Sequence, residues 1–200
     1  MRKKSWFTLI EIIIALMVFS VGVVVLLQAI IYFLGAWSDA NARAQATLLA
    51  KEGMELVFTQ RDTNLLRWVR WDCAAIKKVA AISLGANATD DACAEVMSTG
   101  KIYSVDVWLT GWYTLRSVVN TGEIALYRSM QQGVSFWTHD AQQEPTNFTR
   151  SITFSPAYAS WSVLPQEQVL LVRVRVWYLP GNDTRAITLE SYIAAWEKTE

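Results

Sequence analysis

The sequence has few of the residues on which catalytic and metal sites usually depend. It contains one histidine, His139, and two cysteines, Cys73 and Cys93, which are not arranged as C-x-x-C. The motifs G-x-S-x-G, H-E-x-x-H and G-x-x-x-x-G-K are absent, and so is a dinucleotide-binding fingerprint. We therefore expect no enzymatic activity, no catalytic residue, no cofactor and no metal, and we interpret His139 as a loop residue.

Proline and glycine are also scarce. The first of the four prolines is Pro145, so no proline interrupts a helix in the N-terminal part of the chain. Glycine occurs 9 times, whereas its usual share of about 7% would give about 14 in a chain of this length. Tryptophan, ordinarily among the rarest residues, occurs 10 times.

A long apolar run lies near the N-terminus, from Ile12 to Leu34. Only Ser20, Gly22 and Gln28 interrupt it. As a helix these 23 residues would span roughly 34 Å, which is enough to cross a bilayer core of about 30 Å. An ordinary signal peptide has a shorter apolar core, of about 7–15 residues, and then a cleavage site with small residues. The run therefore favours a transmembrane helix over about residues 12–34.

Three basic residues precede the run, with no acidic residue among them: Arg2, Lys3 and Lys4. This positive charge predicts that the N-terminus stays in the cytoplasm and that the chain after residue 35 lies outside. A single-pass anchor explains these features but not Glu11, a carboxylate at the start of the helix. A charge in the membrane costs about 2.5–3.5 kcal/mol even on lenient insertion scales, so we expect Glu11 to have a dedicated partner.

The segment from Phe7 to Glu11, FTLIE, together with the basic leader and the apolar run, resembles the prepilin signal of type IV pilins and pseudopilins. The resemblance implies that a membrane aspartyl peptidase removes residues 1–6 as a leader and methylates the new amino terminus at Phe7. It also implies that Glu11 pairs with a freed ammonium group, within one chain or between neighbours, and sets the axial register of subunits during assembly. Such a buried pair would specify register more than it adds stability.

Trp6 departs from this family, which has a small residue, almost always glycine, before the cut. The substrate backbone must fit a narrow cleft in the peptidase, so a tryptophan there should block processing. Some bacterial lineages read the codon UGA as glycine, and a different translation table renders it as tryptophan. We hypothesise that Trp6 is a recoded glycine, and that Trp68, at the polar end of a helix, is the next candidate. The alternative is a genuine tryptophan in a substrate that is unprocessed, inactive or cut with relaxed specificity.

Beyond the membrane the helix is expected to continue as an amphipathic half, so that the whole helix covers residues 7–62. Its apolar positions recur at three- and four-residue steps: Ala42, Ala46, Leu49, Gly53, Leu56 and Val57. Residues 63–100 are interpreted as a connecting region with a short helix over 74–84. Cys73 and Cys93 lie on either side of the segment 74–92. Two cysteines in an exported segment indicate a disulfide, which would stabilise the fold by roughly 3 kcal/mol in the chain-entropy model. Two free buried thiols are the alternative.

From residue 101 the periodicity changes to two, which predicts an antiparallel β domain over residues 101–200. We expect strands at 102–108, 112–119, 123–130, 148–155, 168–179 and 185–194, the last two joined by the turn at 180–183. One face of the sheet needs a cover, and the second half of the long helix is available for it. The predicted fold class is therefore α+β, a long N-terminal helix packed on a C-terminal antiparallel sheet, which is also the pilin fold.

The charge of the chain does not favour nucleic-acid binding. The 18 basic and 18 acidic residues cancel, and loss of the three leader cations leaves 15 against 18, a net charge of −3. Phosphate binding draws on clustered basic residues, which such a subunit lacks. Arg173 and Arg175 alternate with valines and are interpreted as a solvated sheet face, with DNA as a less favoured partner.

The sequence thus predicts a structural subunit of a type IV pilus, minor rather than major. It would sit in the cytoplasmic membrane with its N-terminus inside, and then enter an extracellular or cell-surface filament. Its expected partners are other pilin subunits, prepilin peptidase, the pilus assembly machinery and, before assembly, membrane lipid. The alternatives are a pseudopilin of a type II secretion or DNA-uptake system, and a single-pass membrane-anchored binding protein that does not polymerise.

Overall fold

The computed structural model describes residues 9–67, 69–76, 93–107, 113–131, 134–159, 162–163, 168–179 and 184–195. By its internal contacts the chain divides into two compact units, Met1–Asn41 and Ala42–Glu200. The first unit is helical in its described part, and the second contains the sheets.

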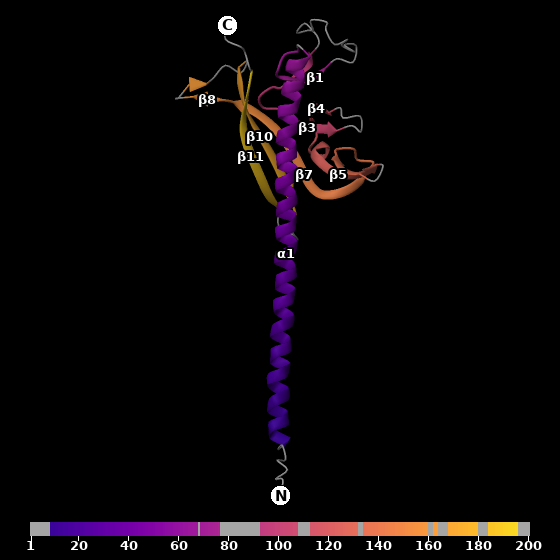
Figure 1. Cartoon of the computed structure of the whole chain (residues 1–200), viewed down its shortest axis with the longest axis vertical. Helices are drawn as coiled ribbons and strands as arrows, with labels where there is room; N and C mark the ends of the chain where they lie inside the picture. The colour runs from indigo at the N-terminus through magenta and orange to yellow at the C-terminus, as the bar shows by residue number, and fades with distance from the viewer. Residues whose placement is uncertain are drawn as a thin grey trace. The chain divides into compact units, whose positions relative to one another are not determined.

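One continuous helix, α1 (Leu9–Leu66), begins in the first unit and ends in the second (Figure 1). Its first turn contains Glu11, whose negative charge is favourable near the positive end of the helix dipole. The helix ends four residues beyond the predicted boundary, and the chain that follows donates hydrogen bonds to two of its last carbonyls. The amide of Arg67 donates to the Thr63 and Asn64 carbonyls, and the amide of Val69 donates to Asn64 as well.

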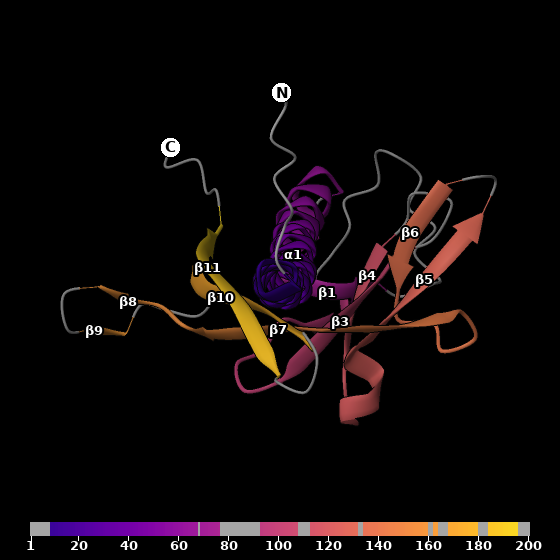
Figure 2. The same ribbon diagram turned by 90° about the horizontal axis from the view of Figure 1, so that it is seen from below.

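The second unit contains a seven-stranded antiparallel sheet in the order β11-β10-β7-β3-β4, with β5 paired to β7 and β6 paired to β5 (Figures 1 and 2). The strands are β3 (Ile102–Val107), β4 (Tyr113–Ser117), β5 (Ala125–Gln131), β6 (Val134–Thr138), β7 (Glu144–Pro156), β10 (Val169–Tyr178) and β11 (Arg185–Ala194). The 13-residue β7 pairs with β10 along one edge and with β3 and β5 along the other. It is therefore the central strand of the sheet.

The core lies between the second half of α1 and one face of β7 and β10 (Figure 2). Along β10, buried residues alternate with the exposed Arg173 and Arg175, as the period of two predicts. The helix contributes Ala46, Leu49, Ala50, Met54 and Val57 to this core. The predicted fold class, a long N-terminal helix packed on an antiparallel sheet, is confirmed.

One local prediction was wrong, and one predicted strand starts later than expected. The expected helix over 74–84 is contradicted in its first residues, because Cys73–Ile76 form strand β1, which pairs with β2 (Cys93–Val96). Residues 77–84 of that prediction lie outside the described residues. The strand expected at 123–130 begins only at Ala125, after a short 3-10 helix, η2 (Thr121–Ile124).

Three further features were not predicted from the sequence. Strand β6 was not predicted, and β7 begins four residues before the expected start. The second small sheet, β8 (Tyr158–Ala159) with β9 (Ser162–Val163), consists of two-residue strands, which are too short for a periodic pattern to reveal.

Candidate functional site

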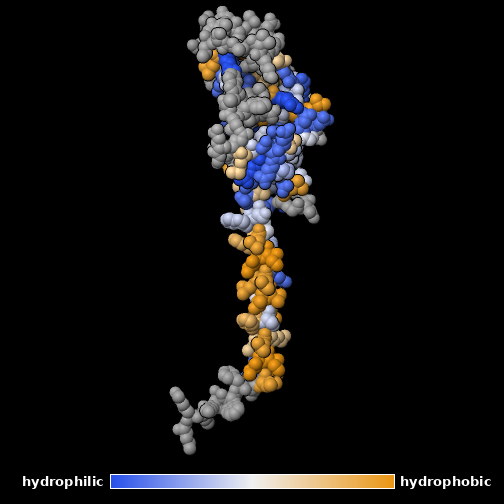
Figure 3. Space-filling model, turned by 90° about the vertical axis from the view of Figure 1, so that its right-hand side faces the viewer, coloured by the Kyte–Doolittle hydropathy of each residue, from blue (hydrophilic) through white to orange (hydrophobic). Residues whose placement is uncertain are grey.

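The apolar part of α1 is exposed along its whole described length. Leu9, Phe19 and Ile31 are each 70–77% exposed, and the large apolar side chains between them are exposed as well. Figure 3 shows the continuous hydrophobic surface that results, in orange. In the described part of the chain, α1 is the one helix that is long enough and apolar enough to cross a membrane. A stretch that is apolar on all sides would be unstable in water and needs lipid or other helices around it.

The interruptions of the apolar run do not break the helix. The hydroxyl of Ser20 donates to the Met17 carbonyl, one turn earlier, at 2.8 Å. The Ser20 hydroxyl thus has a hydrogen-bond partner within the helix. This bond lowers the free-energy cost of placing the hydroxyl in an apolar environment. The helix also continues through Gly22.

Aromatic side chains gather at the end of the apolar run. The rings of Phe33 and Trp37 stack with centroids 6.4 Å apart, and Tyr32 beside them is 80% exposed. Tyrosine and tryptophan are enriched where a membrane meets water, because their rings are amphipathic. The sequence contains this signal, because the three aromatic residues lie within the six residues before the polar segment that begins at Ser38.

Comparison with known families gives a match at this end of the chain. Residues 1–27 match the prokaryotic N-terminal methylation motif. The chain carries the type IV pilin and pseudopilin signal. Comparisons with curated proteins and with solved structures found no match.

The pilin signal implies processing by prepilin peptidase and assembly with other pilins. Together with an apolar helix capable of spanning a membrane, it supports anchoring in the membrane and then a surface filament. It points to a structural protein, a class that is generally without enzymatic activity. Trp6 and Phe7, the residues on either side of the expected cut, lie outside the described residues, whereas Glu11 lies in the first turn of α1.

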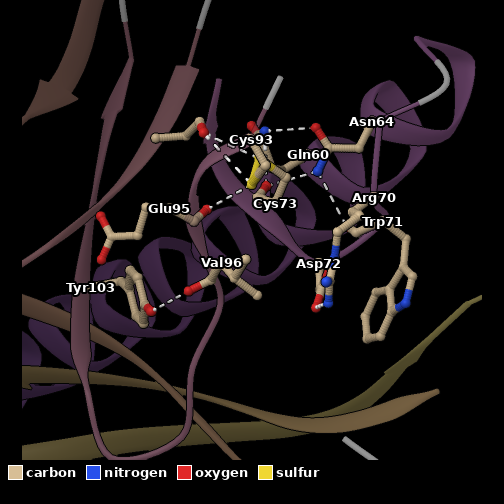
Figure 4. Close-up of a disulfide and its surroundings, with 11 residues drawn as sticks. Gln60, Asn64, Arg70, Trp71, Asp72, Cys73, Cys93, Glu95, Val96 and Tyr103 are labelled. Atoms are coloured by element: carbon tan, nitrogen blue, oxygen red, sulfur yellow. Dashed lines mark hydrogen bonds and ion pairs between the residues drawn. A yellow bond between two sulfur atoms is a disulfide. The ribbon is translucent and has the colours of Figure 1, made fainter. Parts of the chain in front are cut away.

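At the other end of α1, a disulfide joins Cys73 of β1 to Cys93 of β2 (Figure 4). The Cα atoms are 5.7 Å apart, and Cys73 is fully buried. The backbone of β1 and β2 pairs around it, and the Met97 amide donates to the Asp72 carbonyl at 2.7 Å.

Two buried amides tie the end of α1 to this disulfide. The Asn64 side chain donates to the Trp71 carbonyl at 3.1 Å and to the Cys73 carbonyl at 2.7 Å. The Gln60 side chain donates to the Asn64 side-chain oxygen at 3.1 Å. Figure 4 shows both amides on the side of α1 that faces the disulfide. The last turns of the helix and the disulfide therefore form one hydrogen-bonded substructure.

The two arginines considered for nucleic-acid binding lie on the outer face of β10. The Nε atom of Arg173 is 2.6 Å from a carboxylate oxygen of Glu190 on β11. The Arg175 guanidinium lies over the Trp177 ring, 5.0 Å from its centroid. Because one of the two charges is paired, this face offers less free positive charge than the sequence alone suggests.

Two residues have surroundings that were not predicted from the sequence: Arg150 is buried, and His139 is bonded to a neighbouring strand. Arg150 is fully buried on the inner face of β7, between the inward positions of Phe148 and Ile152. His139 follows β6, as a loop residue should, but its Nδ1 atom bonds to the Val105 carbonyl at 2.8 Å. Burial, and secondly the charge of Arg150, lower the pKa of His139 to about 4. The period of two in β7 would have placed Arg150 on the inner face.

Proposed function

We propose that this protein is a minor structural subunit of a type IV pilus. Its leader is cut by prepilin peptidase before Phe7, its new amino terminus is methylated, and it enters the filament through α1. The observation that carries the proposal is the methylation motif over residues 1–27, which overlaps the apolar run of α1 at residues 12–34, where the large apolar side chains are exposed. A helix of this kind suits lipid before assembly and neighbouring helices after it.

The pairing of Glu11 with a freed ammonium at Phe7 is part of the proposal. A carboxylate at the start of a membrane helix needs a partner, and cleavage creates a positive charge four residues before it. Between neighbouring subunits the pair would align one helix with the next. The pair would exist only after cleavage, which couples processing to assembly.

The preference for a minor subunit rests on the Leu- and Val-rich apolar helix and on the large, aromatic-rich β domain. A pseudopilin of a type II secretion or DNA-uptake system would share the same signal. The genes beside this one separate the two cases, because a secretion pseudopilin is encoded with its secretion system. A sheet face that binds DNA is a weaker proposal, since Arg173 is already paired with Glu190.

Mass spectrometry of the native N-terminus tests the proposal directly. A chain that begins with methylated Phe7 is the expected result. A mature chain that keeps Met1 and the leader would reject processing and favour a membrane-anchored protein that does not polymerise. Detection of the processed chain in purified surface filaments, at a small fraction of the main subunit, tests the minor role.

A further inference from the structure

Arg150 is the largest of the fully buried side chains among the described residues. It lies in the interface between β7 and the second half of α1. Its Nη1 atom donates to the Leu49 carbonyl of α1 at 3.3 Å and is 3.6 Å from a carboxylate oxygen of Glu52. The Nε and Nη2 atoms have no hydrogen-bond partner in the described part of the chain. A guanidinium that is buried and only partly satisfied does not by itself stabilise a fold.

Gly53 lets the helix backbone approach this side chain closely. A Cβ atom at Gly53 would lie 2.9 Å from Cγ1 of Val174 and 3.1 Å from Cδ of Arg150. Any larger residue would have to displace the helix or the side chains beneath it. The aliphatic part of the Arg150 side chain therefore packs against Gly53, and its guanidinium lies beside the Glu52 carboxylate.

Part of this interface repeats along both elements. The buried face of α1 carries small residues one turn apart, Ala46, Ala50 and Gly53, and the inner face of β10 repeats Val172, Val174 and Val176. One helical turn advances about 5.4 Å, and two strand residues advance about 6.7 Å. A slip of one turn would bring Ala46 to the place of Ala50, so these two small residues do not by themselves distinguish one register from the next. Leu49, Met54 and Val57 on the same face, and the bond from Asn64 to the Cys73 carbonyl, hold the helix as well.

We propose that Arg150, together with Gly53 and Glu52 of α1, specifies the axial register of α1 on the sheet. A slip of one turn, about four residues, would bring Leu49 or Val57 to the place of Gly53, where there is no room for a side chain. It would also bring Leu48 or Leu56 to the place of Glu52, which leaves the buried guanidinium without a carboxylate. Only the observed register gives Arg150 both its space and its counter-charge. A buried charge that specifies an arrangement while adding little stability is a known use of such groups.

The consequence for assembly rests on the proposed function. In a filament subunit, α1 would carry both Glu11 and the sheet. A slip of one turn would change which residues of α1 the sheet covers, so that subunits would differ in the surface that they present. A fixed register would give every subunit the same surface for its neighbours.

The test compares Arg150→Met with Arg173→Met, a matched control for an arginine on the outer face, 45% exposed and paired with Glu190. The full chain in detergent micelles is followed by hydrogen exchange of α1 peptides over residues 46–60 and by thermal unfolding. For Arg150→Met we expect a melting midpoint equal to or above that of the wild type, because an apolar side chain replaces a buried charge. We also expect exchange in residues 46–60 at least about tenfold faster, because the helix must detach to change register. Arg173→Met should change neither quantity.

Two results with Arg150→Met would overturn the proposal. Unchanged exchange over residues 46–60 would show that apolar packing alone defines the register. A lower midpoint with faster exchange in all elements alike would show that Arg150 merely stabilises the domain.

Glu52→Gln provides a second variant, since Glu52 is 37% exposed and the chain should still fold without its charge. It leaves the buried guanidinium without a counter-charge, so its melting midpoint should fall below that of Arg150→Met. Hydrogen exchange over residues 46–60 should become faster in Glu52→Gln too. If Arg150→Met fails to fold, unchanged exchange in Glu52→Gln overturns the proposal. Exchange is measured on unassembled protein, so a wild-type chain that is never cut at Phe7 would reject the proposed function and leave the register test standing.

Discussion

The side-chain amide of Asn64, in the last turn of α1, donates a hydrogen bond of 2.7 Å to the carbonyl of Cys73, which is one half of the disulfide. Asn64 is fully buried and bonds to the Trp71 carbonyl as well. The helix that carries the pilin signal at its start is therefore joined at its end to the covalently closed part of the second unit.

Replacing Asn64 by alanine should lower the free energy of unfolding by about 2 kcal/mol or more. The change removes a donor from the Trp71 carbonyl and the shorter of two donors from the Cys73 carbonyl, which Gln60 also reaches at 3.4 Å. Weakening the hydrogen bonding of a buried group costs about 1–3 kcal/mol. Thermal unfolding of the full chain in micelles, followed by near-ultraviolet circular dichroism, measures the effect. The control is Asn120→Ala, at an exposed residue, which should change stability by less than about 0.5 kcal/mol. Equal effects of the two substitutions would contradict a structural role for Asn64.

Removal of the disulfide should lower stability by roughly 3 kcal/mol, because the bond closes a loop between residues 20 apart in sequence. The double substitution of Cys73 and Cys93 by alanine and chemical reduction of the wild type should give similar losses. A third sample, the alanine variant treated with reductant, should show no further loss. If the double variant is as stable as the oxidised wild type, the bond does not stabilise the domain.

Glu11→Ala should leave membrane insertion intact but reduce incorporation into filaments more than about tenfold. Loss of one partner from a buried ion pair costs about 3–5 kcal/mol, and each 1.4 kcal/mol is about tenfold in an equilibrium. Immunoblots of membrane and sheared-filament fractions give the ratio. Gln28→Ala, at another polar position of the apolar run, is the control and should assemble normally. Normal incorporation of Glu11→Ala would reject the ion-pair argument.

Trp6→Gly should convert a chain that prepilin peptidase cuts poorly into one that it cuts efficiently, as seen by the mass of the N-terminal peptide after co-expression. If the gene carries UGG at codon 6, recoding is rejected at that site. Equal cleavage of the two chains would instead reject steric exclusion of tryptophan. Recoding is not expected at Trp71, which is buried in the core, or at Trp137, whose ring packs edge-to-face on Phe148 with centroids 5.6 Å apart.

Stability should fall between about pH 6.5 and pH 4 through His139. Its pKa is lowered from 6.5 to about 4 in the folded state, so in this window the unfolded chain binds a proton that the folded chain does not. The loss is absent above pH 6.5, grows as the pH falls and reaches roughly 3 kcal/mol below pH 4. Carboxylates titrate there too, so the measurement is the difference in melting midpoint between wild type and His139→Gln across pH 7.5 to 4.5. A constant difference across that range would mean that His139 does not titrate as expected.

The sequence by itself determined the features that act through composition and local period. The apolar run between Ile12 and Leu34 is long enough to span a bilayer whatever the rest of the chain does, and FTLIE after a basic leader identifies the processing signal. Alternation in β10 and β11 gave the hairpin, and the absence of proline before Pro145 allowed one long helix. Each of these signals is contained in a short stretch of neighbouring residues.

Only the tertiary structure decided the arrangements that depend on distant partners. Residues from Ala74 onward have a composition suited to a helix, yet the first of them form β1, because Cys93–Val96 supplies a paired strand and the disulfide closes it. The burial of Arg150 likewise depends on Leu49, which is 101 residues away in sequence. Its position in β7 predicts an inward side chain, but nothing nearby in the sequence predicts that a glycine and a carboxylate of α1 will meet it there.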